Sequence, residues 1–326
     1  MIIARSPLRI TLGGGGTDLP SYYREHGGFL IAAAIDQHVY VALHRRLEPG
    51  LRVRHADIEE VGDATALRHP ILRAALGELG MTREKLEITS FADLPAGTGL
   101  GSSGSFTTAL LLALHALRGE RPGWRELAEQ ACHIEMNLLG EPVGKQDPSI
   151  AAHGGIAAFD FAPDGTISAT KLAIAPEETV RLQAGLVLFY TGMTRSAGSV
   201  LREQDQRSRA GDAAMMANLH QVKSIGLASR RALEAGDFDG FAAMMHEHWQ
   251  RKKQRAGTMT NPRIDGWYDL AMANGALGGK LIGAGNGGFL MFYTRDRARL
   301  CRAMIAAGTP EVPFDFTDAG TSLVQR

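Results

Sequence analysis

The sequence predicts a protein of two α+β domains. Its 326 residues exceed what one small core requires, and 44% of them are hydrophobic, which is ordinary for a globular protein. Segments with strand-like alternation and segments with helical spacing are interspersed along the whole chain. The pattern resets near Pro176, so we expect one domain over residues 1–177 and a second over residues 178–326.

The N-terminal domain is expected to mix strands and helices. Segments whose apolar residues alternate predict strands at residues 2–12, 30–44 and 85–90, and a hairpin over residues 156–172. Segments whose apolar residues recur every three or four positions predict helices at residues 66–79, 106–117 and 124–139. Gly80, Gly119 and Gly140 follow these helices, as is typical of C-terminal caps.

The C-terminal domain is expected to combine long helices with a smaller sheet. The predicted strands are at residues 185–190, 279–282, 289–293 and 314–316. The predicted long helices are at about residues 199–209, 213–235 and 238–253, and a further helix follows the strand at 289–293.

Charge and cysteine content exclude several kinds of partner. Lys plus Arg and Asp plus Glu number 35 each, so no overall field attracts nucleic acid or an anionic membrane. Cys132 and Cys301 match no disulfide or metal pattern, which is typical of a reducing compartment. Arg5 and Arg9 interrupt any signal-peptide core. We therefore expect a cytoplasmic protein whose partners are small molecules.

Glycine is the most informative residue type in this chain. Many of its 39 glycines gather at residues 13–16, 97–104 and 278–288. Clustered glycines allow left-handed turns and a close approach of the backbone to a ligand. Three such clusters suggest that separate segments converge on one ligand.

The middle glycine cluster predicts a phosphate-binding loop. It follows a strand and precedes an apolar helix, so backbone N–H groups and a helix N-terminus would face the anion. Serine hydroxyls there could contact phosphate or a metal ion. The predicted nucleotide-binding residues are Pro95, Gly97, Gly99, Gly101, Ser102, Ser103, Gly104 and Ser105. The alternative is that the serines only cap a buried helix.

Two common phosphate-binding motifs do not fit. Three glycines of this loop satisfy G-x-G-x-x-G, but residues 93–98 separate them from the strand and Glu120 lies at a helix end. The segment Gly275–Lys280 is one residue short of a P-loop, and Leu281 follows it. The sequence thus argues against a nicotinamide-dependent dehydrogenase.

Three segments together resemble the signatures of the GHMP kinases (galactokinase, homoserine, mevalonate and phosphomevalonate kinases). Residues 6–18 resemble the first signature, residues 95–105 the second and residues 280–289 the third, in the family's order. The resemblance implies an N-terminal domain similar to domain 2 of ribosomal protein S5, a ferredoxin-like C-terminal domain, and use of ATP and Mg²⁺. Gly15 and Gly16 replace the Glu-His pair of galactokinases, which argues against galactose.

Within that family, residues 7–20, 189–196 and 246–264 resemble kinases of D-glycero-D-manno-heptose 7-phosphate. This resemblance implies phosphorylation of the anomeric hydroxyl on the way to a nucleotide-activated heptose. One alternative is a kinase of an unphosphorylated sugar such as fucose, arabinose or an N-acetylhexosamine. Another is a non-catalytic sugar and ATP sensor, although the predicted catalytic residues are all present.

Mg²⁺ needs few protein ligands because it keeps several waters. The expected ligands are Ser103, by its match to the second signature, and Glu135, a carboxylate on the following helix. Asp147, twelve residues after Glu135, would orient the reacting hydroxyl and accept its proton late; its residue type also suits a helix N-cap. Arg9 would neutralise Asp147 and the transferred phosphoryl group. The alternatives are a surface glutamate at position 135 and a solvent-facing strand residue at position 9.

Substrate binding is assigned to two regions. Gly16, Thr17 and Asp18 are expected to contact sugar hydroxyls, although Asp18 could simply begin a turn before Pro20. A phosphate already on the substrate would be held by the basic residues Arg195, Lys252 and Lys253. The alternative for residues 251–255 is a solvated helix end.

Overall fold

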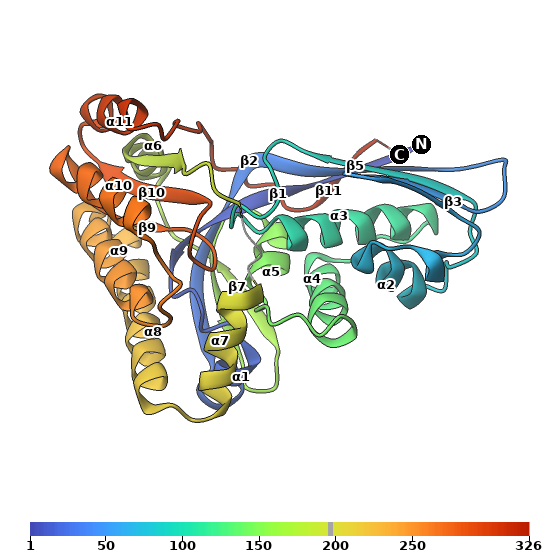
Figure 1. Cartoon of the computed structure of the whole chain (residues 1–326), viewed down its shortest axis with the longest axis horizontal. Helices are drawn as coiled ribbons and strands as arrows, with labels where there is room; N and C mark the ends of the chain where they lie inside the picture. The colour runs from blue at the N-terminus through green and yellow to red at the C-terminus, as the bar shows by residue number, and fades with distance from the viewer. Residues whose placement is uncertain (195–197, 326) are drawn as a thin grey trace.

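The computed structural model describes residues 1–194 and 198–325, which form two α+β units (Figure 1). The first unit is built on an eight-stranded sheet and the second on a three-stranded antiparallel sheet in the order β8-β10-β9. In Figure 1 the helices α2, α3, α4 and α5 lie below the large sheet, and the three-stranded sheet lies among α6 and α8–α11. The expectation of two α+β units is confirmed.

The large sheet is centred on two long antiparallel strands, β1 (Ile2–Gly13) and β2 (Gly28–Arg45). One end of β2 pairs with β6 (Ile156–Phe161) and the other end with β5 (Leu86–Ala92). The remaining strands are β3 (Leu51–Arg54), β4 (Ile58–Val61), β7 (Ile167–Lys171) and β11 (Ser322–Gln325).

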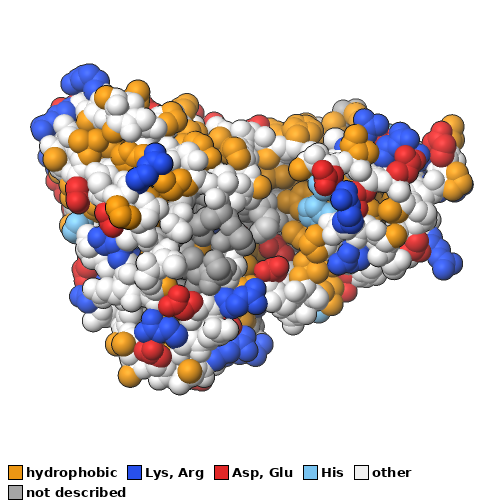
Figure 2. Space-filling view, viewed as in Figure 1, with side chains coloured by type: hydrophobic (Ala, Val, Ile, Leu, Met, Phe, Trp, Pro, Cys, Tyr) orange, Lys and Arg blue, Asp and Glu red, His pale blue; other side chains and the backbone are white. Residues whose placement is uncertain are grey.

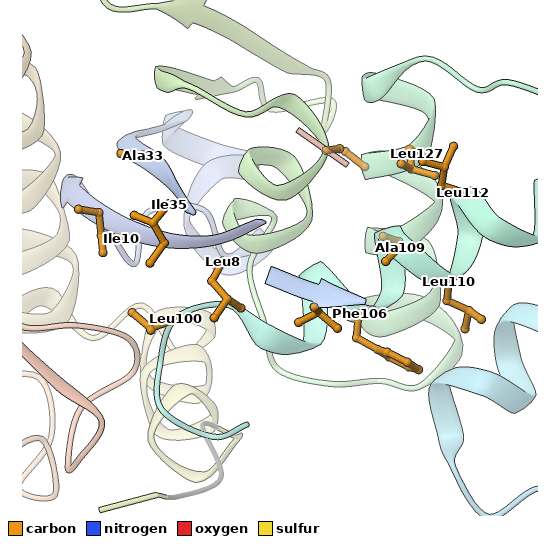
Figure 3. Packing of buried hydrophobic residues seen from close by; sticks show 14 of the residues in the cluster. Leu8, Ile10, Ala33, Ile35, Leu100, Phe106, Ala109, Leu110, Leu112 and Leu127 are labelled. Atoms are coloured by element: carbon orange, nitrogen blue, oxygen red, sulfur yellow. The ribbon is translucent and has the colours of Figure 1, made fainter. Parts of the chain in front are cut away.

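The helix α3 (Ser102–Leu117) is the centre of the first unit because nearly all its faces are apolar and buried. Figure 3 shows Phe106, Ala109 and Leu110 of α3 in the same hydrophobic core as Leu8 of β1. The backbone N–H of Arg9 donates to the carbonyl of Leu100 (3.0 Å), so the N-terminus of α3 is held beside β1. The other helices of this unit are α1 (Pro20–His26), α2 (Pro70–Glu78), α4 (Trp124–Cys132) and α5 (Gln146–His153).

The second unit follows the predicted order of elements closely. Its strands are β8 (Leu186–Tyr190), β9 (Ala276–Leu281) and β10 (Phe289–Thr294). Its helices are α6 (Pro176–Gly185), α7 (Gly198–Arg209), α8 (Ala213–Glu234), α9 (Phe238–Lys253), α10 (Pro262–Ala273) and α11 (Arg297–Ala306). Trp249 of α9, Tyr268 of α10 and Phe292 of β10 pack together in its core.

Two expected elements differ in the structure. The predicted helix over 124–139 is α-helical only to Cys132, and His133–Leu138 forms a π-helical turn, η2. The predicted strand at 314–316 is wrong, because Phe316 forms only an isolated bridge with Ile35. That segment occupies the gap along β2 between β6 and β5, which leaves space for a few residues only. The strand near the end of the chain is instead β11, which pairs with β1.

The end of the chain thus returns to the large sheet, and the boundary at residue 177 stays a prediction. Within residues 1–194 and 198–325, no helix combines the length and the hydropathy needed to cross a membrane.

Candidate active site

A cavity lies between the two units, and Figure 2 shows this face of the molecule hollowed there, with acidic side chains at the hollow. One side, here called the N-terminal wall, carries the polar residues Arg9, Asp18, Ser103, Glu135 and Asp147. The opposite side, here called the C-terminal wall, carries His248, Lys252, Arg255 and Lys280.

All three glycine clusters line this cavity, at Gly15, Gly99 and Gly283. Gly99 has a φ of 83°, and a Cβ added at Gly283 would lie 2.5 Å from its Cα, so neither position has room for a side chain. A Cβ at Gly104 would lie 2.8 Å from the backbone of Asp147, so this glycine lets α3 and α5 begin side by side. The clusters therefore meet at one place.

The centre of the N-terminal wall is an ion pair between Arg9 and Asp147. The Nη2 atom of Arg9 lies 2.6 Å from Oδ1 of Asp147, and its Nε donates to the same oxygen at 2.8 Å. The Nη1 atom donates to the carbonyl of Gly99 (2.6 Å). Arg9 is only 5% exposed, which excludes a solvent-facing role. Asp147 lies in the first turn of α5, and Lys145 occupies the N-cap position.

Glu135 is buried in the π-helical turn, 4% exposed, and is not a surface residue. Burial raises the pKa of Glu135 to about 7, and hydrogen bonds from the hydroxyls of Ser103 and Thr107 oppose this shift. The hydroxyl of Thr107 donates to Oε1 of Glu135 at 3.0 Å. Turns of this π-helical kind are frequent at functional sites.

Glu135 and Ser103 fit a bound Mg²⁺. Both line the cavity at the N-terminus of α3 and offer the hard oxygen ligands that this ion prefers. Within the part of the chain that the structure describes, no group of three His, Cys, Asp or Glu residues could hold a metal alone. An ion here would therefore complete its shell with nucleotide phosphates and water.

Asp18 lies on the N-terminal wall, while Thr17 faces away from the cavity. The Asp18 carboxylate accepts hydrogen bonds from the backbone N–H groups of Gln146 (3.1 Å) and Gly16 (3.2 Å). Burial raises the pKa of Asp18, and the Gln146 hydrogen bond opposes this effect. The Thr17 hydroxyl donates to the carbonyls of Gly14 (2.9 Å) and Phe29 (2.7 Å), so Thr17 anchors the loop.

Some of the residues predicted to bind the nucleotide line the cavity, and others do not. Gly99 and Ser103 line the cavity, and Gly101 has a φ of 80° beside the side chain of Arg9. The Ser105 hydroxyl instead donates to the carbonyl of Pro7 (2.7 Å) inside the protein. The other predicted residues of this loop are Pro95, Gly97, Ser102 and Gly104, which are not among the residues that line the cavity.

The predicted phosphate-binding basic residues are separated by the fold. Lys252 lies on the C-terminal wall, and its Nζ donates to the carbonyls of Leu281 (3.0 Å) and Gly283. Lys253 instead faces Asp265, 3.7 Å away, and does not line the cavity. Arg195 lies outside the described residues.

Sequence reasoning missed three residues of the C-terminal wall. Lys280 at the end of β9 is 2% exposed, and its Nζ is buried without a hydrogen-bond partner. Arg255 is 3% exposed and donates to the carbonyl of Gly15 from Nη1 (3.2 Å) and Nη2 (3.3 Å). His248 on α9 is 3% exposed, with an unpartnered Nδ1. The sequence signals were the place of Lys280 at the start of the third signature, of Arg255 in a basic run, and of His248 and Arg255 within the stretch of resemblance at residues 246–264.

Two family models match this chain. Residues 66–155 match the family model of the GHMP kinases N terminal domain, and residues 229–309 match GHMP kinases C terminal. The D-glycero-alpha-D-manno-heptose 7-phosphate kinase of Campylobacter jejuni is 28% identical, over 98% of this chain and 97% of that protein. The L-fucokinase/L-fucose-1-P guanylyltransferase of Bacteroides fragilis is 27% identical, over 91% of this chain but 35% of that protein.

A solved structure shows the same fold. The crystal structure of a D-glycero-D-manno-heptose 1-phosphate kinase from Bacteroides thetaiotaomicron superposes with a TM-score of 0.81 at 24% identity. The match covers 100% of this chain and 99% of that one. The two family models together span more than half of the chain, in the order of the two units. This chain therefore belongs to the GHMP kinase family, has its two-domain fold, and is an ATP-dependent phosphotransferase.

Proposed function

We propose that the protein transfers the γ-phosphoryl group of ATP to the anomeric hydroxyl of D-glycero-D-manno-heptose 7-phosphate. The product would be the 1,7-bisphosphate, an intermediate towards nucleotide-activated heptose. The observation that carries this proposal is the similarity to the heptose 7-phosphate kinase of Campylobacter jejuni along 98% of the chain. The basic C-terminal wall of the cavity is compatible with an acceptor that is itself phosphorylated.

In this proposal Asp147 orients the attacking hydroxyl. Its carboxylate accepts the hydroxyl proton as the new O–P bond forms and the bond from the γ-phosphorus to the bridging oxygen of ADP breaks. Arg9 fixes that carboxylate from 2.6 Å and places positive charge beside the transferred group. The same side chain donates to the carbonyl of Gly99, so the base and the phosphate loop are held in one arrangement.

The nucleotide phosphates would lie at the N-terminus of α3, where the backbone N–H groups and the positive end of the helix favour an anion. Ser103 and Glu135 would hold Mg²⁺, which neutralises charge on the phosphates. Gly16 and Asp18 would contact sugar hydroxyls, while Thr17 holds the loop that carries them.

A second candidate is a kinase of an unphosphorylated sugar such as fucose. It is favoured by the similarity to the Bacteroides fragilis protein that combines L-fucokinase with a guanylyltransferase, over 91% of this chain. Such an enzyme would need no positive charge for a substrate phosphate.

The proposal is tested by the identity of the product. We would incubate the purified protein with Mg-ATP and a panel of free and terminally phosphorylated hexoses and heptoses, and measure ADP release and product mass. We expect a heptose bisphosphate whose new phosphate is at the anomeric carbon, as assigned by ³¹P–¹H correlation. Turnover of free sugars alone would contradict the heptose 7-phosphate assignment and favour the second candidate.

A further inference from the structure

The C-terminal wall holds buried positive charge without a counterion. Among the described residues, no carboxylate lies within 4.0 Å of the charged nitrogens of Lys280 or Arg255, although both residues are almost fully buried. The Nζ of Lys280 and the Nδ1 of His248 also have no hydrogen-bond partner. Burying a charge or a polar group without a partner is costly, so such groups in a cavity point to a ligand that completes them.

Arg255 of this cluster lies near the loop that is proposed to contact the acceptor sugar. The phosphate loop and the N-terminus of α3 lie on the N-terminal wall, where Arg9 contacts Gly99. Arg255 lies beside the glycine cluster at residues 13–16. Its guanidinium donates to the carbonyl of Gly15, and a Cβ on Gly16 would meet its Nη1. Burial lowers the pKa of Lys280, and the positive charges of Arg9 and Arg255 lower it further, so all three side chains lie near one another. Arg255 therefore lies beside the Gly15–Asp18 loop, which is proposed to contact the acceptor. Its hydrogen bonds run to the neutral oxygens of Gly15, Asn218 and Gln204 and not to a carboxylate.

We propose that Lys280, Arg255 and His248 bind a phosphate group that the acceptor already carries, and so select a sugar phosphate over the free sugar. This inference rests on the proposed sugar-phosphate kinase reaction and names the residues that give it its substrate class. The ammonium of Lys280 and the guanidinium of Arg255 supply charge, and Nδ1 of His248 supplies a donor when its tautomer places the proton there.

The geometry supports phosphate over a carboxylate or a hydroxyl. Lys280 of β9, His248 of α9 and Arg255 just after α9 line the same cavity, and a phosphate has enough oxygens to accept hydrogen bonds from all three. Lys252 lies beside them and orders the third glycine segment through the carbonyls of Leu281 and Gly283. The basic residues of the C-terminal wall are therefore buried and held in place, unlike lysines on the surface.

The test measures binding directly, without turnover. Isothermal titration calorimetry of the full chain would give Kd values for heptose 7-phosphate, free heptose and ATP, in the wild type, Lys280→Met and Arg255→Met. The control is Lys171→Met, which removes an exposed lysine that pairs with Asp318 on the surface. Because the Lys280 nitrogen has no partner, Lys280→Met breaks no hydrogen bond, and we expect its Tm to be no lower than that of the wild type.

We expect Lys280→Met to raise the Kd of heptose 7-phosphate about 10- to 100-fold, which corresponds to the loss of one hydrogen bond to a charged group. The Kd values of free heptose and ATP should change by less than about twofold. The control should resemble the wild type. Loss of ATP affinity in Lys280→Met would overturn the inference, because the cluster would then serve the nucleotide. Unchanged affinity for all three ligands would overturn it as well.

Failure of the proposed function gives a different pattern. A wild type that does not bind heptose 7-phosphate refutes that substrate, and the same titrations with mannose 6-phosphate and other sugar phosphates then test the cluster alone. Binding of any of these that Lys280→Met abolishes supports the inference with another acceptor. A wild type that binds free sugars as tightly as sugar phosphates overturns the inference.

Discussion

The two walls of the cavity differ in how their charged groups are compensated. On the N-terminal wall, Asp147 is paired with Arg9, and Glu135 accepts a hydrogen bond from Thr107. On the C-terminal wall, the nitrogen of Lys280 and one ring nitrogen of His248 are buried without partners. The N-terminal wall is thus organised before any ligand binds, which suits the reacting groups of an enzyme. On the C-terminal wall, Lys252 and Arg255 already bond to protein oxygens, whereas Lys280 and His248 keep buried nitrogens without partners, which suits the proposed role in substrate selection.

The largest expected effect comes from breaking the pair at the centre of the N-terminal wall. Asp147→Asn keeps the size of the side chain but removes the proton acceptor and the counterion of Arg9. We expect kcat/KM for the sugar acceptor to fall about 1,000-fold, the usual contribution of a general base. Steady-state kinetics would measure this loss, and a Tm near that of the wild type would show that the fold is retained. Activity within tenfold of the wild type would exclude Asp147 from the proposed role.

Removing the proposed metal ligand Glu135 should lower the activity less than Asp147→Asn does. Glu135→Gln keeps an oxygen that can accept from Thr107 but removes the negative charge. We expect kcat to fall about 100-fold and the Mg²⁺ concentration for half-maximal rate to rise. Titrating Mg²⁺ at saturating ATP would measure both changes. An unchanged Mg²⁺ dependence would show that the ion is held elsewhere.

The C-terminal wall should make acceptor binding depend on pH. Burial lowers the pKa of Lys280 to about 7 in the free protein, and the charges of Arg9 and Arg255 act in the same direction. A bound phosphate favours the ammonium form, so affinity should fall up to about tenfold per pH unit above pH 7. Below about pH 6 the phosphate itself gains a proton, so affinity should be greatest between about pH 6 and 7.

Arg255 and His248 do not change charge in that range. Burial lowers the pKa of Arg255 to about 10, and that of His248 falls well below its usual value, so His248 stays neutral. The other charged residues that line the cavity are Arg9, Asp18, Glu135, Asp147 and Lys252. Burial raises the pKa of Glu135 to about 7, so Glu135 changes charge in the same range. Calorimetry from pH 5.5 to 9 would measure the dependence, and Lys280→Met should lose the alkaline decline. The same decline in that variant would assign it to another group.

The smallest expected effects contrast two adjacent lysines of α9. Lys252→Met removes a side chain that ties α9 to the third glycine segment, and we expect kcat/KM to fall about tenfold. Lys253→Met removes a partly exposed pair with Asp265, so the change should be less than about twofold. Parallel kinetics of the two variants would measure the contrast. Equal losses would mean that Lys253 reaches the substrate in the working enzyme.

The sequence predicted most of the N-terminal wall because its residues belong to local patterns. The segment from Pro95 to Ser105 carries glycines whose spacing marks a phosphate loop, and the predicted pair of Arg9 and Asp147 meets in the structure. Even there, the local pattern did not reveal that the hydroxyls of Thr17 and Ser105 donate hydrogen bonds to backbone carbonyls. Which way a small polar residue faces depends on the chain packed against it.

The C-terminal wall could not be predicted in the same way. Adjacent residues of a helix point about 100° apart, so the sequence gives no means to rank Lys252 over Lys253 until the helix is placed against its sheet. Arg255 contacts both units, since it donates to Gly15 of the first and to Asn218 of the second, and these residues lie far apart in the sequence. The π-helical turn at Glu135 was likewise expected to be ordinary α-helix.

The central claim is that this kinase acts on a sugar that already carries a phosphate. The most direct measurement is the ratio of kcat/KM for heptose 7-phosphate to that for free heptose, at saturating Mg-ATP and pH 7. The account predicts a ratio of at least about 100, because buried cations left without their anion reject the free sugar. A ratio near or below one would contradict it and make the protein a kinase of free sugars.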